Sequence, residues 1–201
     1  MTPFYTVLAL WVGCLLLSAI LTTETAPIVE GRPNTMLEEY FGKMLTFLTM
    51  AFGQSLIVTL GDKFILGVTV ADLGVFLIFS LFTAFIFILI VYSLVSILGN
   101  VGKAACVILL VFQIAGAGGT FPVEVMPEFY QILQPFLPFT YAIGAMREAI
   151  SGTVAENLFY DFWHLAIFGA IGLTLGILLK KPLHPLLEWF NHKFKESGLS
   201  E

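Results

Sequence analysis

The residues from Leu73 to Gly102 carry no charged side chain, and most of them are Phe, Leu, Ile or Val. An apolar run of this length can cross a bilayer as an α-helix, which takes about 20 residues. The whole chain is similar in character: 58% of its residues are hydrophobic, 11% are charged, and the mean hydropathy is +0.95. Soluble domains have about 25% charged residues, because they must cover their surface with polar groups. The sequence therefore predicts an all-α, polytopic helical membrane protein.

Charge-free windows place five transmembrane helices, at residues 4–22, 44–60, 73–98, 104–118 and 162–179. We expect residues 1–181 to form one membrane domain. A secretory signal peptide is the competing interpretation of the first window, but it would need basic residues before Glu24, and there are none. Gly99 and Asn100 favour a tight turn between the third and fourth helices, which predicts an antiparallel pair.

The stretch from Gly116 to Gly152 is apolar but contains prolines and charged residues, which a straight transmembrane helix does not tolerate. It predicts an outward-facing re-entrant helical hairpin at residues 120–152, with limbs at 121–134 and 139–151. Arg147 and Glu148 either line a translocation path or hold the hairpin at the headgroups. Glu124 and Glu128, four residues apart on one predicted helix face, either bind a cation or form a hydrated face. The candidate outer-gate residues are Phe121, Pro122, Glu124, Pro135, Pro138, Tyr141, Arg147 and Glu148.

Two further segments lie outside the predicted spans. Thr35 and Glu38 match a capping box, which predicts a helix that starts near Met36 and runs into the second span. Pro182 and Pro185 are expected to redirect the chain, so that residues 182–201 form a separate amphipathic helix on the membrane surface. Its apolar face would consist of Leu183, Leu186, Leu187, Phe190 and Phe194.

Basic residues in short loops indicate the orientation in the membrane. One side of the predicted topology carries seven of the nine basic residues, and the other carries Lys63 and Arg147. The C-terminus is therefore expected in the cytoplasm, and five spans then place the N-terminus outside. The net charge of −5 gives no indication of nucleic-acid binding.

Polar and small residues inside the spans suggest packing roles. Gly169, Gly172 and Gly176 predict a helix-packing face, whose partner could lie in this chain or in a second copy. Gln54, Gln113 and Asn100 either line a polar path or make interhelical hydrogen bonds. Asp72 is expected to begin a helix, and Cys14 and Cys106 are expected to be core residues. We find no catalytic, cofactor-binding or metal-binding pattern, so the chain is not expected to be an enzyme.

Several uninterrupted words of the sequence carry a resemblance to a known family. They are FYTVLALWVG (4–13), SLIVTLGDKFILGV (55–68), GNVGKA (99–104) and the stretch 113–152 that contains FPVEVMP and PFLPFTYAI. In this order they resemble the C-terminal membrane region of the YhgE/Pip (phage infection protein) family, within the wider class of ABC-2 type transporter permeases. Members of the family have one N-terminal helix and a long extracytoplasmic region before this block. The present sequence is therefore expected to be a C-terminal fragment, a split gene product or a truncated paralogue.

The resemblance implies a bacterial plasma membrane protein, surrounded by membrane lipid, that works as a homodimer or as a heterodimer with a related permease. It also implies a separate ABC ATPase as a partner, because the chain has no glycine–lysine phosphate loop. In the wider class a short cytoplasmic helix contacts the ATPase. The matching candidates for an ATPase-coupling loop are Thr35, Glu38, Glu39 and Tyr40.

Two functions follow as hypotheses. The first is a permease-like subunit that moves an amphipathic or envelope-related substrate with a separate ATPase. The second is a membrane anchor or scaffold of a phage-receptor or envelope-secretion protein, without transport. The broken hairpin favours the first, because an anchor has no need of interrupted helices at membrane depth.

Overall fold

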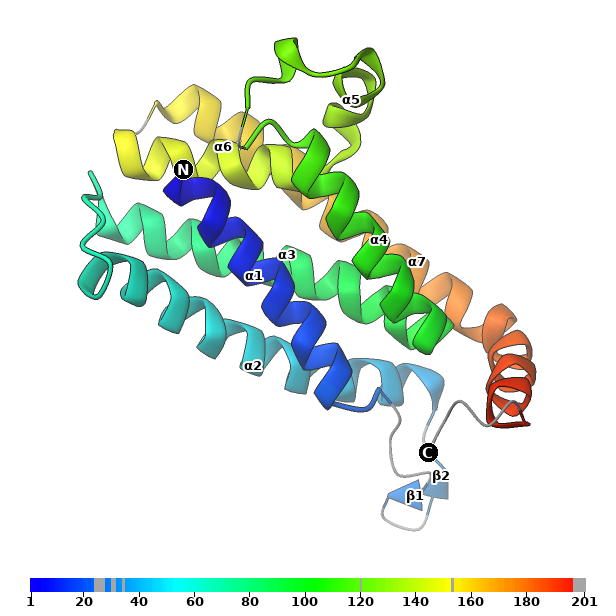
Figure 1. Ribbon diagram of the computed structural model, residues 1–201. Coiled ribbons are helices and arrows are strands. Elements are labelled where there is room, and N and C mark those ends of the chain that lie inside the picture. Colours follow the sequence, from blue (N-terminus) through cyan, green and yellow to red (C-terminus); the bar gives the residue numbers. More distant parts are fainter. Residues whose placement is uncertain (24–27, 30–31, 34, 120, 153, 197–201) are drawn as a thin grey trace.

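A computed structural model describes residues 1–23, 28–29, 32–33, 35–119, 121–152 and 154–196. Within these ranges it describes the backbone alone for 28–29, 32–33 and 184–196. The chain folds into an elongated bundle of helices (Figure 1). The elements are α1 (Thr2–Ile20), β1 (Ile28–Val29), β2 (Arg32–Pro33), α2 (Met36–Phe64), α3 (Leu73–Leu98), α4 (Asn100–Gly116), the 3₁₀ turn η1 (Val123–Val125), α5 (Glu128–Leu133), the 3₁₀ turn η2 (Gln134–Phe136), α6 (Pro138–Ser151) and α7 (Ala155–Glu196). The two short strands pair antiparallel, Ile28 with Pro33 and Val29 with Arg32.

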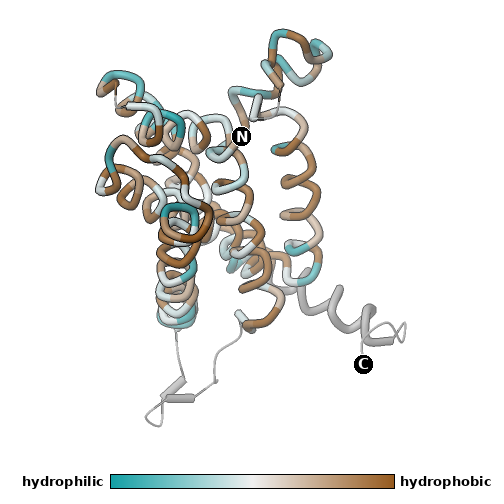
Figure 2. The backbone as a smooth tube through the Cα atoms, turned by 60° about the vertical axis from the view of Figure 1, so that its left-hand side comes forward, coloured by the Kyte–Doolittle hydropathy of each residue, from teal (hydrophilic) through white to brown (hydrophobic). Residues whose placement is uncertain are grey.

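Within the described residues, four helices are long and apolar enough to cross a membrane: α1, α2, α3 and the part of α7 up to Leu183. They confirm four of the five predicted spans, and α3 has the predicted bounds. The remaining predicted span corresponds to α4, an apolar helix of 17 residues whose crossing of the membrane stays a prediction. Figure 2 shows hydrophobic residues along most of the long helices and hydrophilic residues gathered towards their ends.

Helix α3 is the centre of the bundle, in contact with α1, α2, α4, α6 and α7. Small residues on α7 allow a close approach to α3. A Cβ atom on Gly172 would lie 3.2 Å from the Ile90 Cα atom of α3, and Gly169 faces the Ile86 side chain. The glycine face predicted on the last span is therefore confirmed as a packing face, and its partner lies in this chain.

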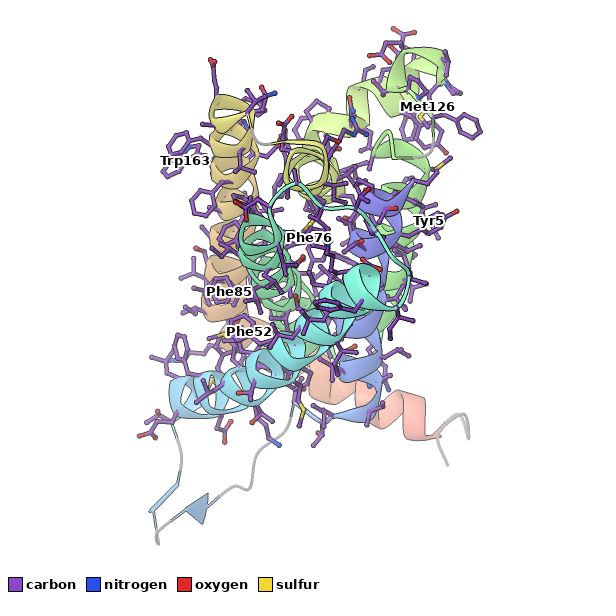
Figure 3. The ribbon with its side chains drawn as sticks, turned by 90° about the vertical axis from the view of Figure 1, so that its left-hand side faces the viewer. Tyr5, Phe52, Phe76, Phe85, Met126 and Trp163 are labelled. Carbon is purple, nitrogen blue, oxygen red and sulfur yellow. The ribbon has the colours of Figure 1, made fainter. Side chains whose placement is uncertain are left out.

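Side-chain hydrogen bonds and aromatic contacts join α2 to its neighbours. The Gln54 amide nitrogen donates to the Ala9 carbonyl oxygen of α1 at 3.2 Å, which confirms the interhelical role predicted for Gln54. Phe52 of α2 stacks on Phe85 of α3 with ring centroids 6.4 Å apart (Figure 3). The second span is thus fixed to both the first and the third.

The connections separate into two ends of the bundle (Figures 1 and 3). One end holds the N-terminus, the α2–α3 connection and the stretch between α4 and α7. The Ala71 amide nitrogen, in the α2–α3 connection, donates to the Ile150 carbonyl oxygen of α6 at 3.2 Å. The other end holds the α1–α2 connection, the α3–α4 turn and the C-terminal part of α7. This arrangement agrees with the two sides assigned from the basic residues.

Two expectations about helix ends need correction. The separate helix predicted after Pro182 and Pro185 is wrong, because α7 continues as one helix to Glu196; it changes direction towards its C-terminal end (Figures 1 and 3). Each proline removes one backbone donor, and a long helix can accommodate such a loss locally. The apolar face predicted for residues 182–201 lies almost wholly outside the described side chains. The first limb predicted at 121–134 is not continuous, since it contains the short elements η1 and α5 with a break between them.

Candidate functional site

The interrupted segment between α4 and α6 is built around its prolines. Pro127 caps α5, Pro135 lies at the start of η2, and Pro138 is the first residue of α6. Proline suits these starting positions, because its missing amide hydrogen and fixed φ angle disturb nothing there. The segment therefore changes direction at each proline and forms the protrusion labelled α5 in Figure 1.

Two hydrogen bonds fix this segment to the start of α6. The Tyr141 hydroxyl donates to the Pro135 carbonyl oxygen at 2.9 Å, and the Thr140 hydroxyl donates to the Gln134 carbonyl oxygen at 2.9 Å. They satisfy carbonyl groups that a broken helix would otherwise leave unpaired. Tyr141 and Pro138, both predicted as gate residues, are buried and serve to hold the segment in place.

Four of the predicted gate residues line one hollow of about 330 Å³: Phe121, Pro122, Glu124 and Arg147. Both charged members are exposed, so their charges stay hydrated. Glu128 lies in α5, whereas Glu124 lies in η1, so the predicted single helix face for these two carboxylates is wrong. The stretch Met126–Pro127 interrupts the helix between them. Gly118 and Gln134 also line this hollow, although they are not among the gate residues predicted from the sequence.

Glu148 joins α6 to α7. Its carboxylate accepts hydrogen bonds from the Val154 amide nitrogen at 3.0 Å and from the Asn157 side-chain nitrogen at 3.2 Å. Glu148 therefore caps the start of α7, where a negative charge is favoured by the helix dipole. Through these hydrogen bonds Glu148 fixes the turn between α6 and α7.

Helices α6 and α7 also approach each other at Gly144. A Cβ atom there would overlap the Asp161 carboxylate, with the Cγ atom at 2.8 Å. One turn before Gly144, the Tyr141 ring is nearly parallel to the His164 ring, with centroids 4.7 Å apart. Glycine at position 144 thus leaves room for the Asp161 carboxylate between the two helices.

The close approach at Gly144 predicts that a change at Asp161 reverses the destabilising effect of a change at Gly144. Gly144→Ala should lower the thermal unfolding temperature, because the added methyl group displaces the Asp161 carboxylate. In a chain carrying Asp161→Ala, the same Gly144→Ala change should stabilise, since alanine favours a helix over glycine by about 0.8–1 kcal/mol. The coupling between the two changes should fall within about 0.5–3 kcal/mol, measured as a double-mutant cycle in detergent. Strictly additive effects would show that the two positions are not in contact.

The start of α2, at the opposite end of the bundle, holds the predicted coupling residues. The Thr35 hydroxyl accepts from the Glu38 amide nitrogen at 3.3 Å, and the Glu38 carboxylate accepts from the Thr35 amide nitrogen at 2.9 Å. The predicted capping box and the helix start at Met36 are therefore confirmed. Thr35 and Glu38 are exposed, and Glu39 is half-buried.

Tyr40 differs from the other three, because its side chain lies inside the bundle. Its hydroxyl is 2.7 Å from the Ser93 hydroxyl, and the Tyr92 hydroxyl donates to the Tyr40 carbonyl oxygen at 2.7 Å. The Lys180 ammonium group lies 5.4 Å from the centre of the Tyr40 ring. These contacts join α2, α3 and α7, so Tyr40 positions the start of α2 from within.

The described residues contain no group of three or more His, Cys, Asp or Glu side chains that could hold a metal ion. The two cysteines, Cys14 and Cys106, are buried free thiols. The notable features are thus an interrupted segment at one end and an acidic, capped helix start at the other.

Four apolar spans and a short interrupted segment define a multi-pass membrane protein. The chain belongs to the ABC-2 family of transporter proteins, whose family model matches residues 1–178. Membership of this family and the apolar helices place it in the plasma membrane.

A curated relative extends this finding. The uncharacterized protein YhgE of Bacillus subtilis (strain 168) is 33% identical over 179 residues, which are 89% of this chain and 22% of the relative. The resemblance to YhgE and to ABC-2 permeases is confirmed. The chain spans only about a fifth of the length of this relative. No solved structure matches the chain.

Proposed function

We propose that this chain is a permease-like membrane subunit of an ABC-2 type transporter. It works as a dimer, with itself or with a related permease, and a separate ATPase drives it. It moves an amphipathic or envelope-related substrate across a bacterial plasma membrane. The chain itself is not an enzyme.

The observation that carries this proposal is the family match over residues 1–178, which covers both ends of the bundle. The acidic start of α2 and the interrupted segment between α4 and α6 lie at opposite ends (Figure 1). A transporter needs a contact for its energy source on one side of the membrane and a closure on the other. We assign the α2 start and the C-terminus to the cytoplasm, and the interrupted segment and the N-terminus to the outside.

Coupling between the two ends would pass through packed helices. Tyr40 contacts α3 and the Lys180 side chain of α7, and α7 is joined to α6 through Glu148 and Gly144. A movement of the α2 start would therefore reach the gate hollow through contiguous side chains. In this mechanism the ATPase shifts the population between inward-open and outward-open states.

A second candidate function is a membrane anchor without transport. It is favoured by one observation, that this block makes up only 22% of the length of YhgE. In that case the rest of a longer protein, or a separately encoded outer segment, would carry the activity. The interrupted segment would then merely seal the outer end of the anchor.

Affinity purification of the tagged chain from native membranes in mild detergent separates the two functions. We expect an ATPase in stoichiometric amount, identified by mass spectrometry. The double change Glu38→Lys and Glu39→Lys should remove it, because the surface charge is reversed. An envelope partner without any ATPase would support the anchor instead.

Two matched variants separate surface charge from helix capping. Glu38→Gln with Glu39→Gln removes both charges and retains a glutamine that can complete the capping box. Thr35→Ala breaks the box, at a cost of about 1 kcal/mol, without a change in charge. We expect the glutamine pair to weaken ATPase recovery and Thr35→Ala to leave it intact. If Thr35→Ala instead weakened ATPase recovery and the glutamine pair left it intact, helix capping would matter and the carboxylates would not contact the ATPase.

A further inference from the structure

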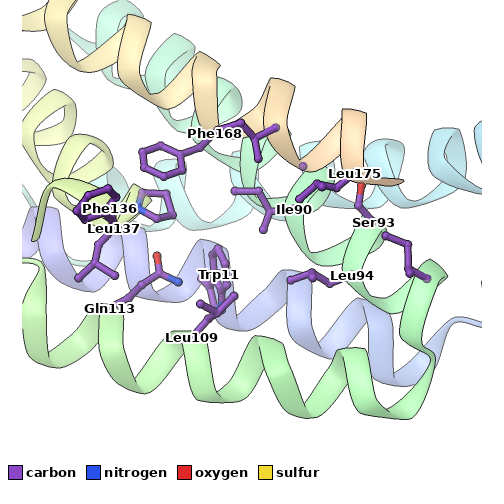
Figure 4. Close-up of a pocket in the computed structure, with 14 residues that line it drawn as sticks. Trp11, Ile90, Ser93, Leu94, Leu109, Gln113, Phe136, Leu137, Phe168 and Leu175 are labelled. Atoms are coloured by element: carbon purple, nitrogen blue, oxygen red, sulfur yellow. The ribbon is translucent and has the colours of Figure 1, made fainter. Parts of the chain in front are cut away.

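An apolar groove of about 240 Å³ lies between α4 and α7 (Figure 4). Both helices pack on α3, which forms the floor of the groove together with Trp11 of α1. Leu137 lies in the lining near one end, and Leu94 and Leu175 lie further along. On α7 the lining extends from Phe168 to Leu175, which is about 10 Å at a rise of 1.5 Å per residue. The groove is therefore apolar and runs along about two turns of α7.

Two polar side chains in this lining have no hydrogen-bond partner among the described residues. The Gln113 side chain is 1% exposed, and both its amide oxygen and its amide nitrogen are unpaired. The Trp11 side chain is fully buried, and its indole nitrogen is also unpaired. Figure 4 shows Gln113 reaching from α4 into the groove beside Trp11. Buried polar groups in folded proteins nearly always have a partner, so these atoms indicate a ligand with a hydrogen-bonding group.

The lining limits the chemistry of that ligand. It contains no charged side chain, so the group that meets Gln113 is uncharged. The remaining wall is almost wholly hydrocarbon and suits an apolar chain. Gln113 lies one turn before the end of α4, so a ligand held there would extend its chain along the groove towards Leu94 and Leu175.

We propose that this groove binds one acyl chain of a membrane glycerolipid, whose ester carbonyl oxygen accepts a hydrogen bond from the Gln113 amide nitrogen. The Trp11 indole nitrogen is a second donor in the same lining. Lipid has direct access, because the lining residues Leu109, Ile171 and Leu175 are themselves exposed apolar residues. The proposal adds a lipid site to the proposed permease and does not depend on transport or on an ATPase.

A second copy of the chain fits this groove less well than a lipid. A helix with its side chains is about 10–12 Å across, and Gln113 and Trp11 lie at the bottom of the groove with almost no exposed surface. A helix from a second copy would rest on the rim and leave these atoms unpaired. An acyl chain is thin enough to reach them.

Tryptophan fluorescence provides a direct test. The chain has three tryptophans, and Trp163→Phe with Trp189→Phe leaves Trp11 as the single reporter. This chain is reconstituted, without any ATPase, into vesicles of phosphatidylcholine with dibrominated acyl chains and into matched unbrominated vesicles. Bromine quenches tryptophan only at short range, so a buried Trp11 should be quenched only if a brominated chain enters the groove.

Matched variants locate the quenching. Leu109→Phe with Ile171→Phe adds bulk to two lining residues. Ile108→Phe with Ile167→Phe adds comparable bulk at positions outside the lining. We expect the first pair to abolish the quenching and the second to leave it unchanged. Gln113→Leu should weaken it, because the ester carbonyl loses its donor.

Four outcomes would overturn the proposal or its hydrogen bond. If Trp11 is unquenched in the starting chain, no acyl chain reaches the groove. If Trp11 is quenched equally in both double phenylalanine variants, the bromine acts from outside the bundle. If Trp11 is unquenched and the groove-filling pair also changes a dimer to a monomer in size-exclusion chromatography, a second copy fills the groove. Equal quenching in Gln113→Leu would overturn the assigned hydrogen bond. A failure to find an ATPase partner would leave all of these readouts unaffected.

Discussion

Replacing Gly102 with alanine is expected to disrupt the α3–α4 pair and cost about 3 kcal/mol, at the upper end of what overpacking typically costs. Gly102 lies in the first turn of α4, directly against the last turns of α3. A Cβ atom at this position would overlap the Leu94 carbonyl oxygen, with the Leu94 carbonyl carbon at 2.7 Å and the Val95 Cα atom at 2.9 Å. These are backbone atoms, so no rotamer change can relieve the overlap.

The turn leaves no room for the helices to move apart. Gly99, the residue between α3 and α4, has a φ angle of 56° and a ψ angle of −126°, a combination that side chains disfavour. Unfolding of the purified chain by denaturant titration would measure the loss. Retention of α4 beside α3 can be followed through thiol labelling of the buried Cys106.

Gly61→Ala is the matched control for this change. Gly61 lies in α2, and a Cβ atom there would meet nothing within 4 Å. Alanine at this position should stabilise the chain by about 0.5–1 kcal/mol, through helix propensity alone. Equal stability of the Gly102→Ala and Gly61→Ala chains would show that α3 and α4 do not approach as closely as the structure places them.

The helices that cross the membrane could be predicted because the bilayer restricts where charges can lie. Asp72 interrupts an otherwise apolar sequence, and its carboxylate accepts from the Val75 amide nitrogen at 3.1 Å at the start of α3. Gly99 ends the same helix, as expected from its position after the apolar run. Local signals of this kind, a cap and a turn residue at the ends of an uncharged run, are sufficient to place a long span.

The site residues could be predicted less well, because their roles depend on contacts between distant segments. Tyr40 follows the acidic capping box and was expected to face a partner, yet its ring lies between α3 and Lys180. Glu124 and Glu128 have helical spacing, but Pro127 begins a new helix between them. Gln113 was expected to line a path or bond to another helix, and it lines the groove without a partner in the described chain.

Trp11→Ala is the second change with a large expected effect. The Trp11 ring is fully buried against two phenylalanines, with centroids 5.0 Å from Phe87 of α3 and 5.7 Å from Phe139 of α6. Phe87 and Phe139 stack on each other at 5.4 Å. This cluster joins the first span to the central helix and to the helix that follows the interrupted segment.

Truncation of a buried tryptophan to alanine should cost about 3–5 kcal/mol, because it leaves a cavity and removes many packing contacts. The loss should also free α6 from the bundle. A cysteine at the buried position Ala142, in a chain without Cys14 and Cys106, would then react with a thiol reagent. We expect slow labelling in the parent chain and fast labelling after Trp11→Ala.

The control for this change is Trp163→Ala, because Trp163 is 59% exposed on α7. Its effect on protein stability should stay within about 0.5 kcal/mol, as for most surface changes, and Ala142→Cys should remain protected in it. If Trp11→Ala instead unfolds at the same denaturant concentration as Trp163→Ala, α1 does not hold α6 in place. The interrupted segment would then have to be positioned by α3, through the stacked Phe87 and Phe139 rings, and by α7, through Glu148 and Gly144. The coupling route from α2 would not need the first span.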